Sequence, residues 1–334
     1  MYNIKKIIQE AIKRRLLERK SDFDEYELTS CIIELYSNPD NTVVKLLDEG
    51  DDDSPHAIHI PNHVIYISLK PEVITGSINL NNMMFESKIF RENDSIMKCF
   101  EDKNFDSNIL LKLDFKLQHG NNRNSEAEYQ LYDNNDVSII INTKKLYNKD
   151  NKDYNLDAFG GDPLSKVIPD ELAKRVFHDM KNNVNMRRNV YHEFSHFYTN
   201  IKSNSLARMP DLSLLAQDED KFDKDYANNY HENHARIAGI VADLKLALSS
   251  VGSGKTLRVS NNITVYLTHL KQYQTTGNHT MFEKAVNDLM IEYNDKTRGY
   301  KKLTNQMKRK IEKRAVEITM YINSHYDLRS IEII

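Results

Sequence analysis

The stretch that most constrains this chain is His-Glu-Phe-Ser-His at residues 192–196. On an α-helix, residues four positions apart project from one face, so His192 and His196 can reach a single metal ion. Glu193 lies beside them, where its carboxylate can act on a water molecule bound to that metal. Two imidazole nitrogens and an adjacent carboxylate are the groups that zinc-assisted hydrolysis requires.

The surrounding sequence predicts that this stretch lies on a buried helix. Val190, Phe194 and Phe197 give the segment an apolar side, and no glycine or proline interrupts residues 170–204. A buried helix that carries a polar catalytic edge has this pattern. The alternative is an ordinary amphipathic helix whose two histidines are solvated.

A third metal ligand is expected from a later segment, because catalytic zinc keeps three protein ligands and one position for water. Residues 226–249 carry apolar residues at helical spacing and predict a second amphipathic helix. Glu232, near its start, is the preferred ligand, since small residues three and seven positions later would let the two helices approach closely. His234 and His231 remain rival candidates for the same role.

The two segments together carry a family resemblance. The HExxH stretch followed by Glu-Asn-His-Ala-Arg at residues 232–236 resembles the zincin metallopeptidases that have a glutamate third ligand. In particular it is similar to the ImmA/IrrE-type and phage-type members, which pair HExxH with a downstream ExxAR-like helix. The resemblance covers roughly residues 108–250. Arg236 stands where a thermolysin-like signature would have an aspartate.

The resemblance implies a role for each site residue. His192, His196 and Glu232 correspond to the metal ligands, and Glu193 to the general base. The cofactor is then zinc, and the reaction is hydrolysis of a peptide bond in a protein or peptide substrate.

Further catalytic candidates flank the expected third ligand. Tyr230 and His234 are predicted to donate hydrogen bonds to the oxyanion of the tetrahedral intermediate, with Tyr226 and His231 as alternatives. Asp243 follows Glu232 by about three turns and so lies on its face. It is interpreted as a surface aspartate, although it could orient a ligand histidine through the second ring nitrogen.

The expected fold class is α+β, with a zincin-like core made of a small twisted sheet, the HExxH helix and the second ligand helix. Residues 1–105 are predicted to form a helical and mixed N-terminal region, and residues 106–250 the metallopeptidase domain. Residues 251–334 are predicted to be helical. The chain is long enough for such an arrangement.

The strands are expected ahead of the HExxH helix. Alternating patterns over residues 108–146 predict a meander of three strands, and residues 56–69 predict another strand. Val137–Thr143 is the predicted edge strand, which would receive an extended peptide by strand addition. Residues 38–55 have the composition of a loop. Helices are expected over residues 1–20 and 25–37, and before the HExxH segment from Pro169 onward.

Composition limits the partners. A net charge of −3 shows no general bias toward nucleic acid or membrane surfaces. There is no stretch of about 18 apolar residues, so no membrane span is expected. The charged first 20 residues do not resemble a secretory signal, and Cys31 and Cys99 are interpreted as reduced thiols. These features predict a cytoplasmic protein. Its richness in Asn, Lys, Ile, Asp and Tyr indicates an AT-rich genome, such as that of a bacterium or a phage. A phage-encoded protein would act in the cytoplasm of the host cell.

The sequence therefore favours a zinc-dependent metallopeptidase. The alternative is a non-catalytic regulatory or host-interaction protein that keeps a zincin scaffold. A third possibility is a helical protein in which HExxH occurs by accident. Oligomeric state and cleavage specificity are not encoded in any pattern of this sequence.

Overall fold

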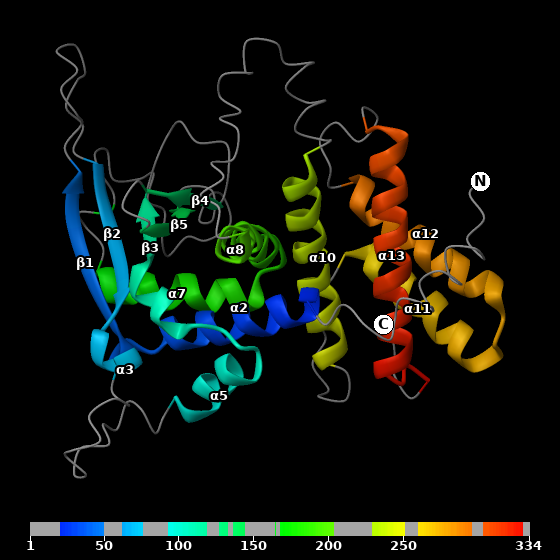
Figure 1. The fold of residues 1–334 in the computed structure, drawn as a ribbon, viewed down its shortest axis with the longest axis horizontal. Helices are drawn as coiled ribbons and strands as arrows, with labels where there is room; N and C mark the ends of the chain where they lie inside the picture. Colours follow the sequence, from blue (N-terminus) through cyan, green and yellow to red (C-terminus); the bar gives the residue numbers. More distant parts are fainter. Residues whose placement is uncertain are drawn as a thin grey trace. The chain divides into compact units, whose positions relative to one another are not determined.

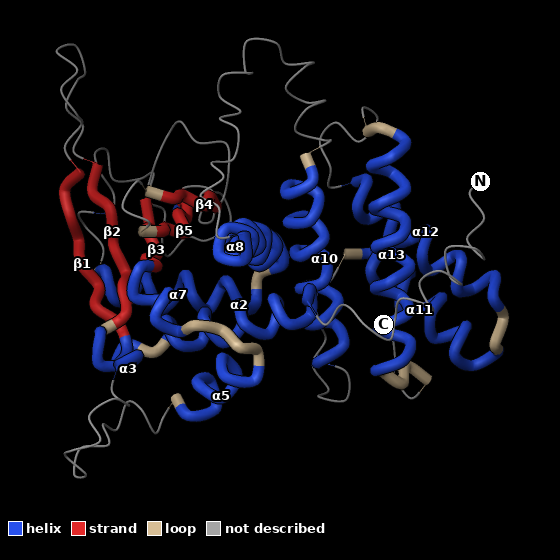
Figure 2. Tube along the Cα trace, viewed as in Figure 1, coloured by secondary structure: helices blue, strands red, loops and turns tan. Residues whose placement is uncertain are grey.

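A computed structural model describes residues 21–49, 62–75, 93–118, 127–132, 136–143, 164, 168–203, 229–250, 260–295 and 303–329. Over these residues the protein is a mixed α+β structure, mostly helical, with a small open sheet of five strands (Figures 1 and 2). The predicted α+β class is confirmed. The predicted helix over residues 1–20 and the candidate Tyr226 lie outside the described residues.

The chain divides into two compact units, which are described separately. Asp24–Phe197 form one unit, called here the sheet unit, and the other unit, called the helical unit, is described mainly from Tyr198 onward. The three regions expected from the sequence, with boundaries near residues 105 and 250, remain a prediction of domain organisation.

The sheet has an order that differs from the order of its strands along the chain. Its strands lie in the order β1-β2-β3-β5-β4, where β3 pairs with β5 in parallel and the other pairs are antiparallel. The predicted simple meander is therefore wrong, because β5 is inserted between β3 and β4. The bounds are β1 Thr42–Glu49, β2 Asn62–Leu69, β3 Leu113–Gln118, β4 Ala127–Leu131 and β5 Val137–Asn142.

The predicted edge strand over Val137–Thr143 is also wrong, because β5 lies inside the sheet and β4 forms the edge. Every residue of β5 is buried. A near-continuous apolar run such as Val-Ser-Ile-Ile-Ile is typical of a strand with neighbours on both sides and both faces covered. The more polar β4 suits an edge, where one side of the backbone is left for other partners.

Two further local predictions require correction. Residues 38–55 are predicted to form a loop, but in their described part, residues 38–49, Pro39–Asn41 form a short 3₁₀ helix and β1 begins at Thr42. The segment Thr-Val-Val-Lys-Leu-Leu has β-branched and apolar residues that favour a strand despite the polar residues on either side. The strand expected from residue 108 begins only at Leu113, after a second 3₁₀ helix.

The helices of the sheet unit match the sequence patterns where these were assigned. The helix predicted over residues 25–37 is confirmed as α2, and α7 begins with Pro169 in its first turn, followed by Asp170 and Glu171. The HExxH segment lies on one continuous helix, α8. The bounds are α2 Ser21–Ser37, α3 Pro71–Thr75, α5 Asp94–Asp102, α7 Pro169–Asn182 and α8 Val184–Ser203.

An aromatic cluster holds these helices against the sheet. The ring of Phe115 on β3 lies 5.1 Å from Phe177 on α7 and 6.0 Å from Phe194 on α8, between ring centroids. Tyr36 on α2 packs against the same ring at 4.9 Å, and its hydroxyl donates to the backbone carbonyls of Leu110 and Leu113. The cluster fixes α8 beneath the sheet, and the HExxH residues with it.

The helical unit consists of four long helices in its described part, which confirms the helical pattern predicted for the end of the chain. Ser260 and Thr304 cap α11 and α13 through their side-chain oxygens. Gly277 ends α11 with a positive φ of 68°, a conformation that costs glycine little. The bounds are α10 Tyr230–Ser250, α11 Asn261–Thr276, α12 His279–Asp295 and α13 Asn305–His325.

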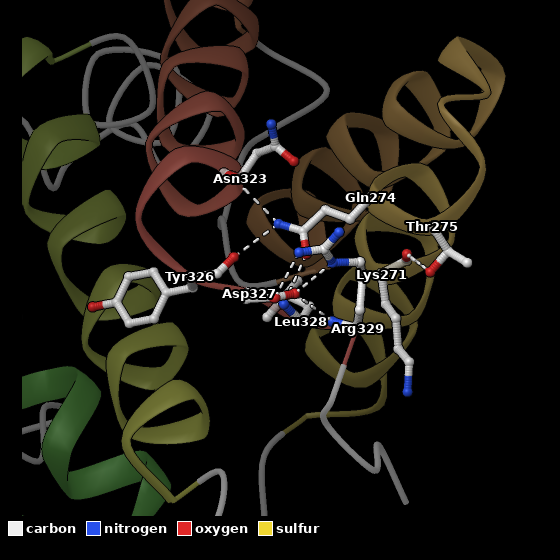
Figure 3. A network of polar contacts seen from close by, with 8 residues as sticks. All are labelled: Lys271, Gln274, Thr275, Asn323, Tyr326, Asp327, Leu328 and Arg329. Atoms are coloured by element: carbon white, nitrogen blue, oxygen red, sulfur yellow. Dashed lines mark hydrogen bonds and ion pairs between the residues drawn. The ribbon is translucent and has the colours of Figure 1, made fainter.

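Gln274 joins α11 to the segment that follows α13 (Figure 3). Its amide nitrogen donates to the carbonyls of Asn323 at 3.2 Å and Tyr326 at 2.8 Å. Its amide oxygen accepts from the N–H of Leu328 at 2.7 Å. One side chain thus satisfies three backbone groups where α13 ends. None of the described helices has the length and apolar character that crossing a membrane requires.

Candidate functional site

The HExxH residues lie in the middle of α8, whose position is set by buried side chains. Asn183 precedes the helix, and its side-chain oxygen accepts from the N–H groups of Asn185 and Met186, in the manner of a helix cap. Val190 and Phe194 are fully buried. The apolar side predicted from the sequence therefore faces the core, and the histidines occupy an adjoining side of the same helix.

Tyr191 provides a second anchor for this helix. Its hydroxyl forms a 2.7 Å hydrogen bond with Ser30 on α2, and its ring stacks on Tyr26 at 5.2 Å between centroids. Burial raises the pKa of Tyr191 well above its ordinary value. The phenol therefore stays protonated at all moderate pH values, which suits an anchoring hydrogen bond.

The two histidines converge on each other. The Nε2 atoms of His192 and His196 lie 3.2 Å apart, and the two rings are nearly perpendicular, at 81°. His196 is buried, whereas His192 is partly exposed. Both side chains therefore present the same ring nitrogen to one point, as the spacing of four residues predicts.

This separation has the value expected of two zinc ligands. Two nitrogens that are each about 2.05 Å from a tetrahedral zinc ion lie about 3.3 Å apart. The same distance also permits an N–H···N hydrogen bond between neutral rings. The two arrangements differ in protonation, because a metal requires that neither Nε2 carry a proton. The donor set fits zinc, a borderline-soft ion that accepts imidazole readily.

Glu193 is oriented by the edge of the sheet. Its Oε2 atom accepts a 2.8 Å hydrogen bond from the backbone N–H of Tyr129, in the middle of β4. Tyr129 lies opposite Ile139 of β5, and its N–H is directed instead to the carboxylate. The ring of Tyr129 also lies 6.4 Å from that of His196. Strand β4 therefore runs beside the HExxH residues within the sheet unit.

The candidate third ligands lie in the first turn of α10, in the helical unit. Asn229 caps this helix, because its side-chain oxygen accepts from the N–H groups of His231 and Glu232 at 2.8 and 3.3 Å. Glu232 is 5% exposed, whereas His231 is exposed and His234 is intermediate. A carboxylate is costly to bury unless it is paired or binds a metal, so burial favours Glu232 over His231 as a ligand.

Tyr230 and His234 lie on another side of α10. At about 100° per residue, each is about 160° around the helix axis from Glu232. Both line a cavity formed with α13, and Tyr230 is 56% exposed. Their predicted role as hydrogen-bond donors to an oxyanion stays a prediction, and their position on the helix also makes them part of this cavity.

The sequence did not indicate the contact made by Tyr129 or the burial of Asp243. Tyr129 contributes only its backbone N–H to Glu193, so no residue type could have indicated it. Asp243, interpreted as a surface residue, is fully buried on α10, and that interpretation is wrong. Its spacing of three turns from Glu232 was the available signal, because it places both carboxylates on one face of the helix.

No family model, curated protein sequence or solved structure matches the chain.

Proposed function

We propose that the protein is a zinc-dependent metallopeptidase. The observation that carries this proposal is the convergence of His192 and His196, with Nε2 atoms 3.2 Å apart, beside a glutamate that is oriented by an edge strand. The α+β architecture and the HExxH helix beneath the sheet agree with the zincin resemblance. We further propose that the protein is located in the cytoplasm of a bacterium or of a phage-infected cell.

His192, His196 and Glu232 are the proposed metal ligands. The two histidines converge within the sheet unit, and the buried Glu232 is the carboxylate that the zincin resemblance pairs with them. Two neutral imidazoles and one carboxylate are a common set for catalytic zinc and leave one position for water. Zinc bound there supplies Lewis acidity, which brings the pKa of its water to about 7 and polarises the scissile carbonyl.

Glu193 is the proposed general base. Its carboxylate takes the proton of the attacking water and later delivers it to the amine that leaves. The hydrogen bond from the Tyr129 N–H to Oε2 orients the carboxylate for this proton transfer.

Strand β4 is the proposed docking edge for the substrate. β4 is the edge strand that contacts Glu193 and lies beside His196 of α8. An extended peptide can add to such an edge through backbone hydrogen bonds. Recognition through the backbone requires a substrate segment that is unfolded or in a loop. The proposed substrate is therefore an extended segment of a protein.

The test is the zinc content of purified protein, measured by elemental analysis for the wild type and three variants. We expect about one zinc per chain in the wild type and a large loss in His196→Ala and in Glu232→Ala. His178→Ala is the matched control, because His178 is an exposed histidine on α7, and it should keep its zinc.

The outcomes separate the candidate functions. Wild-type protein without zinc, or zinc that survives both ligand substitutions, would refute the proposed metal centre. Zinc that is lost as expected, in a protein that cleaves no protein or peptide from a diverse substrate library, would favour the non-catalytic alternative on the same scaffold.

A further inference from the structure

A cavity of about 320 Å³ lies between the first turns of α10 and the middle of α13, within the helical unit. This volume is at the lower end of the range typical of small-molecule sites. Apolar side chains line part of it, and aromatic and charged side chains line the rest. The lining residues are Tyr230, Asn233, His234, Ile237, Met307, Lys310, Ile311, Lys313, Arg314 and Glu317.

The charged side chains of this cavity all come from α13 and leave an excess of positive charge. Three cations line the cavity together with a single acid, Glu317. Arg314 donates to Glu317 Oε2 at 2.9 Å, and Lys313 Nζ lies 4.0 Å from Oε1. Glu317 is thus engaged by its own helix neighbours. No described carboxylate forms an ion pair with Lys310, which leaves its charge available to a ligand.

The opposite wall of the cavity is aromatic. The rings of Tyr230 and His234 are nearly parallel, at 7°, with centroids 6.3 Å apart. Lys310 Nζ lies 5.5 Å from the Tyr230 ring centroid, so the available cation and the exposed ring are neighbours. A tyrosine that is 56% exposed is a large apolar surface to leave in water.

The remaining lining explains why the cavity is preorganised. Ile237 and Ile311 are buried core residues of α10 and α13, and Met307 is buried beside them. Asn233 is held by the hydroxyl of Tyr293 on α12 and donates to the carbonyl of Asn229 at 2.6 Å. The two walls therefore stand on fixed helices, and a ligand would not have to order them.

We propose that this cavity binds a small organic anion with an aromatic ring. The ring would stack on Tyr230, and the phosphate or carboxylate would bind Lys310 and Lys313. The flat apolar ring of such a ligand matches the aromatic wall in shape, and its anionic group matches the two lysines of the other wall in charge. This site does not rest on the proposed metal centre, because its α10 residues lie on a side of the helix away from Glu232.

The test uses phenyl phosphate as the probe and ligand-observed NMR titration as the measurement. We expect saturable binding with a dissociation constant of about 1 mM or tighter, which is reasonable for so small a ligand. Inorganic phosphate and phenol, which each carry half of the probe, should bind at least about tenfold more weakly. Lys310→Ala and Tyr230→Ala should each weaken phenyl phosphate binding about tenfold.

Lys245→Ala is the matched control. Lys245 is a lysine of the same unit whose Nζ lies 5.5 Å from the Tyr326 ring centroid, away from the cavity. This variant should bind the probe like the wild type. His196→Ala should also retain binding, which separates failure of this site from failure of the metal centre.

Three results would overturn the proposal. The first is no saturable binding of phenyl phosphate up to concentrations about twentyfold above the expected constant. The second is equal weakening in Lys245→Ala and Lys310→Ala, which would indicate nonspecific attraction to lysine. The third is equal affinity for inorganic phosphate and phenyl phosphate, which would show that the aromatic wall does not contribute to binding. Circular dichroism of each variant confirms that the comparison is between folded proteins.

Discussion

The Glu193 carboxylate accepts a 2.8 Å hydrogen bond from the backbone N–H of Tyr129. This contact joins the glutamate of the HExxH stretch to the edge strand of the sheet. The orientation of Glu193 is therefore set by the main chain of another element. In the proposed reaction, the base and the peptide-docking edge are positioned by the same strand.

Glu193→Gln should retain zinc and lose turnover. Glutamine keeps the size of the side chain and can still accept the Tyr129 N–H, but it cannot take a proton from water. Loss of a positioned general base typically lowers the rate by about 10²- to 10⁴-fold. Peptidase activity and zinc content should be measured on the same preparation. Activity within a fewfold of the wild type would exclude Glu193 as the base.

Tyr129→Pro should reduce the catalytic rate without loss of zinc. Proline removes the N–H that holds Glu193, and an edge strand tolerates proline where the N–H does not pair with the sheet. Loss of a hydrogen bond to a charged group costs about 1.5 to 3 kcal/mol, or about ten- to a hundredfold in kcat/KM. Tyr129→Ala is the control, because it removes the ring but keeps the N–H. Equal effects of the two variants would assign the role to the ring.

Cys99 should react with iodoacetamide at a lower pH than Cys31. A hydrogen bond between the two thiols, on α5 and α2, lowers the pKa of Cys99 and raises that of Cys31. A lowered pKa increases the thiolate fraction near neutral pH, and the thiolate is the reactive form. Mass spectrometry after alkylation from pH 6.5 to 9 should show Cys99 modified first. Cys31→Ala should shift the Cys99 profile to higher pH, and an unchanged profile would contradict the pairing.

Gln274→Ala should destabilise the helical unit. The side chain satisfies three backbone groups at and just after the end of α13, and leaving such groups without protein partners costs about 1 to 3 kcal/mol in the free energy of unfolding. Gln272→Ala is a close control, since Gln272 is an exposed glutamine on the same helix and the change in helix propensity is the same. Denaturant unfolding should show a difference between the two variants, and identical midpoints would be evidence against this network.

The sequence predicted those helices whose apolar residues recur at helical spacing and are buried in the folded protein. The helix over residues 184–203 was recognisable because its apolar residues recur at helical spacing and its interior has no glycine or proline. The pairing of His192 and His196 followed from the same periodicity, since residues four positions apart project from one face of a helix.

The sheet order was beyond the reach of local pattern. Strands β3, β4 and β5 follow one another in sequence, and short turns normally favour neighbours. Here β5 lies between β3 and β4, and its continuously apolar, fully buried residues are typical of an interior strand. The Tyr129 contact was missed for a related reason, because a main-chain donor depends on strand register and leaves no trace in residue identity.

The placement of β4 at the outside of the sheet has an evolutionary consequence. Its backbone pairs with β5 on one side only, which leaves the N–H of Tyr129 directed away from β5 and toward Glu193. Its contact with Glu193 uses an N–H that every residue except proline provides. In evolution the side chain at position 129 can therefore change, to any residue but proline, while the hydrogen bond that orients Glu193 is kept.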